Sequence, residues 1–120
     1  MRVFVYYNLH RKLWSVKALE GPRKGLVVLH SHAVLLQDAT PKVSEAGRQR
    51  VLKEKRKNVH AGIVGQLVPM GAEGGFPGFP GGAEVTYNPY KYVGFVYRQD
   101  ERPYTGSDYA LLTEKRVFAL

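Results

Sequence analysis

The chain of 120 residues contains no cysteine. Disulfide bonds, thiolate nucleophiles and cysteine-based zinc sites are therefore excluded, and nothing in the sequence points to secretion. No apolar run approaches the roughly 18 residues that a membrane-spanning helix needs. Charged residues follow the N-terminus too soon for the apolar core of a signal peptide. We therefore expect a protein that works inside a cell and does not enter a membrane.

Sequence motifs of familiar catalytic chemistry are missing as well. The sequence contains no P-loop, HExxH motif, nucleophile elbow or dinucleotide-binding fingerprint. His30 and His32 lie two residues apart in an apolar run, as metal ligands sometimes do, but no third ligand follows at a recognisable spacing. We therefore expect no metal and no other cofactor, and we expect that the protein is not an enzyme.

A concentrated positive charge is the strongest feature that is present. Residues 42–57 hold seven Lys and Arg and two Glu, so they supply five of the chain's eight net positive charges. Such a field attracts polyanions, above all those that carry phosphate groups. A basic face can also serve only to keep a protein soluble, although such a face usually mixes charges of both signs. We favour phosphate binding.

Patterns typical of β-strands occupy much of the remaining sequence. A chain of this length forms a single domain. Runs rich in Val, Phe and Tyr predict N-terminal antiparallel strands within residues 1–38 and C-terminal strands within residues 84–119. A short glycine-containing strand is expected over residues 61–68.

One helix is expected between these groups of strands. Thr40-Pro41 is expected to end the first sheet, and a basic helix is expected over residues 43–58 with Ser44 as its N-cap. The apolar stripe of this helix is narrow, which favours packing at a sheet edge or against another subunit. The sequence thus predicts an α+β fold with a mainly antiparallel sheet and one principal basic helix, in an oligomer.

The segment over residues 70–83 is rich in glycine and proline and is expected to be an irregular loop. Phe76 and Phe79 are its only large aromatic side chains. A ring on such a loop can close over a nucleotide base. The two rings can equally pack back onto the core, as in an Ω-loop, and the sequence leaves both interpretations open.

Two further groups of residues are candidates for nucleotide binding. At the end of the basic helix, Lys53 and Arg56 share a helical face and Asn58 and His60 follow closely, which is compatible with a phosphate site. Further along, the segment TYNPYKY interleaves aromatic rings with Asn88 and is followed by Arg98 and Arg102. These tyrosines form either one half-buried face of a sheet or a wall on which bases stack.

Three stretches resemble the small phage-encoded anti-Thoeris proteins of the first described type. They are VYYNLHRKLWSVKALEGP, KVSEAGRQRVLKEKRKNVHAG and TYNPYKY. The resemblance covers most of the chain apart from the loop of residues 70–83 and the C-terminal tail. It implies a protein that sequesters cyclic ADP-ribose isomers without cleaving them and, in some members, cyclic trinucleotides at a separate site. It also implies a homo-oligomer, with dimers building a hexamer, in the cytoplasm of the infected bacterial host.

The same resemblance implies particular binding residues. Five positions would serve the ADP-ribose-isomer site, namely Phe79, Tyr87, Asn88, Arg98 and Arg102. Four positions would serve the cyclic trinucleotide site, namely Lys53, Arg56, Asn58 and His60. An RNA- or DNA-binding domain that uses the basic helix and the tyrosine-rich sheet is the alternative function. A small nuclease or nucleotide hydrolase is a third.

Overall fold

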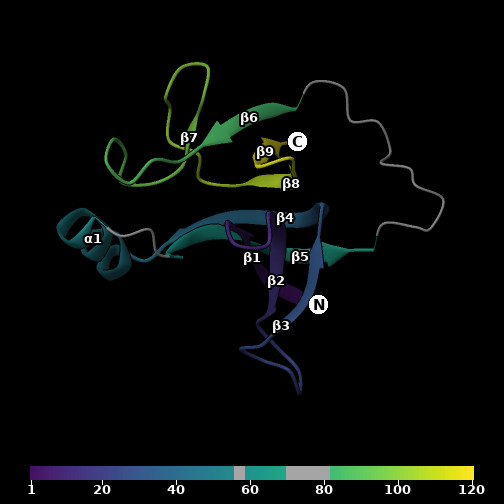
Figure 1. Cartoon of the computed structure of the whole chain (residues 1–120). Coiled ribbons are helices and arrows are strands. Elements are labelled where there is room, and N and C mark those ends of the chain that lie inside the picture. The colour runs from purple at the N-terminus through teal and green to yellow at the C-terminus, as the bar shows by residue number, and fades with distance from the viewer. Residues whose placement is uncertain (56–58, 70–81) are drawn as a thin grey trace.

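We describe the protein from a computed structural model, of which residues 1–55, 59–69 and 82–120 are discussed. Within these ranges the chain forms nine strands and one helix, α1 (Glu45–Glu54). All strands join one antiparallel sheet, in the order β3-β2-β1-β5-β4-β8-β9-β6-β7 (Figure 1). The strands are β1 (Arg2–Asn8), β2 (Leu13–Ala18), β3 (Val27–Ser31), β4 (Ala33–Val43), β5 (Ala61–Val68), β6 (Ala83–Thr86), β7 (Val96–Tyr97), β8 (Ser107–Thr113) and β9 (Arg116–Ala119).

The predicted α+β class is wrong. The described residues form mostly antiparallel sheet, and α1 has only 10 residues. Ser44 caps the start of α1 as expected, since its side chain accepts a hydrogen bond from Gly47 N at 3.2 Å. The helix ends after Glu54, where Lys55 takes a left-handed conformation (φ 54°) and its N–H bonds to Val51 O at 2.8 Å. α1 is therefore a short connection with one buried side chain, Val51.

The expectation that Thr40-Pro41 ends the first sheet is also wrong. Strand β4 continues through Pro41 to Val43, and Pro41 pairs with Ile63 of β5. On its other side, the pairing of β4 with β8 has already ended at Ala39. A proline is tolerated here because it lies where β4 has a partner on one side only.

The sheet bends so that its two halves face each other. In Figure 1 the C-terminal strands β6, β8 and β9 lie above β4 and β5, while β2 and β3 extend below them. One core joins both halves, as Val5 and Ile63 from the N-terminal half cluster with Val85 and Val117 from the C-terminal half. In the described ranges no helix has the length and apolar character of a membrane-spanning segment.

Candidate ligand-binding cleft

A cleft of about 510 Å³ lies between the two halves of the sheet. We call it the interlayer cleft. Its walls come from β1, β2 and β5 on one side and from β6, β9 and the segment after β6 on the other. Five of its lining residues are aromatic, namely Tyr6, Tyr7, Trp14, Tyr87 and Phe95. Five are charged, namely Glu84, Arg98, Glu114, Lys115 and Arg116.

Two pairs of aromatic rings line the cleft. Tyr7 and Trp14 are cross-strand partners in the β1–β2 hairpin, and their ring centroids lie 5.2 Å apart in an edge-to-face arrangement. On the opposite wall, Tyr87 and Phe95 are stacked with centroids 5.2 Å apart. Such faces are suited to a planar ring of a ligand, because stacking tolerates any aromatic heterocycle.

Trp14 carries a buried polar atom beside this cleft. Its side chain is buried, and its Nε1 has no hydrogen-bond partner among the described residues. An unpaired indole N–H in a protein interior is unfavourable, so buried tryptophans usually find an acceptor. Because Trp14 is the only tryptophan of the chain, its fluorescence reports on this cleft alone.

The charged residues gather at the rim of the cleft. The Glu84 carboxylate forms an ion pair with the Arg98 guanidinium at 2.7 Å, and the Arg116 guanidinium lies 4.0 Å from the same carboxylate. Lys115 Nζ lies 5.6 Å from the centroid of the Tyr7 ring, in a cation–π arrangement. Three cations and two carboxylates line the cleft, counting Glu114, so the lining carries one net positive charge. An anionic group is favoured there.

Lys115 lies in a tight turn between β8 and β9, and this turn sets its position. Thr113 and Arg116 are paired across this hairpin, so Glu114 and Lys115 form a two-residue loop. Both have positive φ angles, 48° and 66°. Such turns normally use Asn and Gly, because other residues are strained in the left-handed region. The strained backbone directs Lys115 toward Tyr7 of the opposite half.

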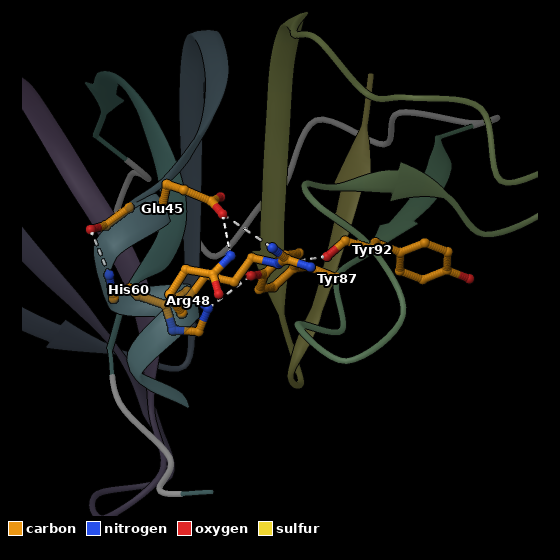
Figure 2. Close-up of polar contacts among 8 residues, drawn as sticks. Glu45, Arg48, His60, Tyr87 and Tyr92 are labelled. Atoms are coloured by element: carbon orange, nitrogen blue, oxygen red, sulfur yellow. Dashed lines mark hydrogen bonds and ion pairs between the residues drawn. The ribbon is translucent and has the colours of Figure 1, made fainter. Parts of the chain in front are cut away.

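Beside Tyr87 of the cleft, polar contacts join α1, the residue before β5 and the segment after β6 (Figure 2). His60 Nε2 lies 2.8 Å from the Tyr87 hydroxyl, and Arg48 Nε donates to the backbone oxygen of Tyr92 at 3.2 Å. Arg48 is also paired with Glu45 at 3.2 Å. Burial raises the pKa of the Tyr87 phenol, so this hydroxyl stays protonated at neutral pH.

Gly47 allows α1 to approach His60 closely. A Cβ atom at this position would lie 2.6 Å from the Cβ of His60. The glycine that weakens α1 as a helix therefore lets it pack against the residue that holds Tyr87. Through Arg48, α1 also contacts the segment after β6.

The predicted site residues have different surroundings in the structure. Tyr87 and Arg98 both line the interlayer cleft. His60 was assigned to the separate trinucleotide site, but it contacts Tyr87 directly, so these two predicted groups meet. Arg102 lies apart from the cleft, paired with Asp100 at 2.6 Å and placed over the Tyr97 ring at 5.1 Å.

None of the other predicted positions that the structure describes lines the interlayer cleft. Lys53 is an exposed residue on α1 and does not line the cleft. Phe79, Arg56 and Asn58 lie outside the described residues. Asn88 is exposed and organises a turn, since its Oδ1 accepts from Tyr90 N at 2.9 Å and its backbone oxygen accepts from Tyr92 N at 2.8 Å.

We expect Asn88 to stabilise this turn and not to contact a ligand. Asn88→Asp keeps the oxygen that accepts from Tyr90 N, so it should fold and bind ligand like the wild type. Asn88→Ala removes that oxygen and should lower the free energy of unfolding by about 0.5–1 kcal/mol. Thermal unfolding and ligand titration of both variants test this. If an amide N–H of Asn88 contacted the ligand, Asn88→Asp would bind as weakly as Asn88→Ala.

His30, one of the two histidines considered above as metal ligands, lies in β3 and makes a contact within the sheet. His30 Nδ1 lies 2.9 Å from the Ser15 hydroxyl, and the two residues are cross-strand partners. Ser15 is completely buried, so its oxygen cannot reach a substrate. The described residues contain no group of three or more side chains that could hold a metal ion.

Several cleft residues escaped prediction from the sequence, namely Tyr6, Tyr7, Trp14, Glu84, Lys115 and Arg116. A signal existed for one pair, because a hairpin with its turn at residues 10–12 places Tyr7 opposite Trp14. No signal marked Lys115 and Arg116, since the turn Glu114-Lys115 lacks the usual turn residues.

Comparison with known proteins places the whole chain in a phage family. The family model described as Mycobacterium phage L5 gene 82 protein matches residues 1–120. The "Gene 82 protein" of Mycobacterium phage L5 is 44% identical over 125 residues, which cover 99% of this chain and 95% of that protein. No solved structure matches. The anti-Thoeris resemblance stays a prediction. The chain belongs to the family of the Mycobacterium phage L5 gene 82 protein.

Proposed function

We propose that this phage protein binds a small phosphorylated nucleotide messenger of the host's defence in the interlayer cleft and holds it unchanged. The observation that carries this proposal is the combination of facing aromatic walls with a cationic rim in one cleft of about 510 Å³. Cavities of a few hundred Å³ suit ligands of nucleotide size. A cyclic ADP-ribose isomer is the ligand that the sequence resemblance favours.

The parts of such a ligand match the parts of the cleft. A purine stacks on Tyr7–Trp14 or on Tyr87–Phe95, and each stacked base contributes about 1–3 kcal/mol. The pyrophosphate lies at the rim, where Arg98, Lys115 and Arg116 supply the positive charge. This orientation buries the base and leaves the phosphates at the mouth of the cleft.

We propose that the protein acts by sequestration and not by catalysis. Tyr87 is the hydroxyl that borders the cleft beside a histidine, and burial raises the pKa of this phenol, which makes it a poor nucleophile at neutral pH. The hydroxyl of Ser15, also beside a histidine, is completely buried. A ligand held between aromatic walls would therefore be kept away from its receptor without chemical change.

Trp14 fluorescence provides the test. Titration with cyclic ADP-ribose should change the emission in a saturable manner, because this single tryptophan borders the cleft. After denaturation of the complex, the recovered ligand should be intact. Adenosine, which lacks phosphates, should bind at least about tenfold more weakly. Unchanged emission with cyclic ADP-ribose and its isomers would contradict the proposal, and a hydrolysed ligand would indicate an enzyme.

The predicted cyclic trinucleotide site and homo-oligomer can be tested with the same protein. Because His60 contacts Tyr87, a trinucleotide bound at His60 should compete with cyclic ADP-ribose. Independent binding of the two ligands would place the trinucleotide elsewhere. Native mass spectrometry of the protein, alone and with each ligand, reports both the number of subunits and the number of bound ligands.

A nucleic-acid interface on α1 is the second candidate. Arg50 and Lys53 are exposed on this helix, and Lys42 is exposed just before it. A polynucleotide held by such residues would lose affinity steeply as salt rises, whereas a pocket for a doubly charged ligand would lose little. Affinity for a single-stranded RNA oligonucleotide, measured across a range of salt concentrations, separates the two functions.

A further inference from the structure

We propose that Glu84 is a placeholder anion in the interlayer cleft. Its carboxylate gathers Arg98 and Arg116 at one point of the rim, and a phosphate group of the ligand displaces the carboxylate from these two guanidinium groups. The inference rests on the proposed function, since it assigns Glu84 a part in selecting the ligand of that same cleft. Glu84 would then set how much negative charge a ligand needs.

The sheet brings the two arginines to Glu84 from opposite sides. Glu84 lies on β6, which pairs with β7 on one side and β9 on the other. Arg98 follows β7 directly, and its backbone N–H bonds to Glu84 O at 3.0 Å. Arg116 begins β9. The backbone therefore fixes both arginines beside the same carboxylate, with guanidinium–carboxylate distances of 2.7 Å and 4.0 Å.

Exposure indicates which partner stays in place. The Glu84 side chain is only 20% exposed, whereas the side chains of Arg98 and Arg116 are 66% and 59% exposed. The carboxylate is therefore held in the wall of the cleft, and the guanidinium groups extend into solvent. Ion pairs with such exposed partners are weak, so both arginines can turn toward an incoming anion at little cost.

A phosphate group is a better partner for this arginine pair than the carboxylate. It offers more acceptor oxygens, and guanidinium groups bind it through paired hydrogen bonds. The displaced Glu84 carboxylate would remain nearby and repel the new anion. Weakly charged anions would therefore be rejected, and ligands with two phosphate groups would be accepted. Glu84 thus acts as a specificity determinant.

Glu84→Gln is the decisive variant, with inorganic pyrophosphate as the probe. The glutamine keeps the size of the side chain and removes its charge, so the arginines lose their internal counter-ion. Pyrophosphate titration, followed by NMR signals of the Arg98 and Arg116 Nε–H groups, should show about three- to fivefold tighter binding than in the wild type. Glu54→Gln is the matched control, because it makes the same charge change at an exposed position on α1.

The outcomes separate the two proposals. Equal pyrophosphate affinity in wild type and Glu84→Gln, or equal gains in Glu84→Gln and Glu54→Gln, would overturn the role of Glu84. That result would leave the proposed function intact if cyclic ADP-ribose still changes Trp14 fluorescence. Should Glu84→Gln fail to fold, the wild type still decides. Pyrophosphate must then shift the Nε–H signals of both arginines, and their failure to move would overturn the proposal.

Discussion

Replacing Gly62 with alanine is expected to lower the free energy of unfolding by about 3 kcal/mol or more. Gly62 lies on β5 beside the interlayer cleft, and a Cβ atom there would fall against the carbonyl oxygen of Val5. It would also lie 2.6 Å from the Phe4 ring. The Val5 oxygen belongs to the backbone of the neighbouring strand β1, so it cannot turn aside as a side chain could. The strands themselves must separate.

Thermal unfolding measures this effect. For a domain of this size, Gly62→Ala should lower the melting temperature by roughly 12 °C or more. Gly94→Ala is the matched control, because no atom lies within 4 Å of the Cβ position there and φ is not positive. The control should be neutral or slightly stabilising. Similar melting temperatures for the two variants would show that β1 and β5 are spaced differently.

Replacing both Arg98 and Arg116 with alanine should weaken binding of cyclic ADP-ribose by about 30- to 100-fold. These two arginines provide most of the hydrogen-bond donors that the rim can direct at a pyrophosphate. Lys115 remains and contributes a single charged group without a planar fork. Fluorescence titration of Trp14 gives the affinity, and binding of uncharged adenosine should stay unchanged.

The control for this prediction removes the same charge from another surface. Arg50→Ala combined with Lys53→Ala takes two exposed cations from α1, away from the lining of the cleft. Solvent and salt screen such distant charges, so nucleotide affinity should change by less than about twofold. If the α1 variant loses binding and the cleft variant keeps it, the basic helix is the binding surface and the cleft is not.

Strand positions were the most predictable part of the fold. Runs rich in Val, Phe and Tyr predicted antiparallel strands within residues 1–38, and β1, β2 and β3 lie in this range. The short glycine-containing strand expected over residues 61–68 is β5, Ala61–Val68. Side chains alternate between two faces along a strand, so local sequence carries much of this information.

The fold class depended on contacts that local sequence does not encode. The basic run suggested a helix to about Asn58, but Lys55 ends α1 by adopting a left-handed conformation. Pro41 suggested the end of a sheet, but β4 has a partner on one side only at this point and tolerates it. Because of these two errors the predicted helix was too long and the predicted sheet too short. In both cases pairing between distant segments overrode the local propensity of the sequence.

The candidate site was predictable only in part. Residues Tyr87 and Arg98 line the cleft, but the strong positive charge of residues 42–57 directed attention to α1. Arg48 of that run holds the backbone of Tyr92 and is only 14% exposed in its side chain. Bending of the sheet assembled the cleft from strands far apart in sequence, and charge density along the chain gave no sign of it.

The Glu114-Lys115 turn links the stability of this protein to the ligand binding that we propose for the interlayer cleft. An Asn-Gly sequence would relax the left-handed backbone at these two positions, and such replacements commonly make a hairpin more stable. Here the relaxed hairpin would also lose the ammonium group that lies over Tyr7. If the cleft binds the proposed ligand, a more stable fold and tighter binding therefore make opposite demands on this one loop. A phage that depends on the proposed ligand binding would keep the strained turn.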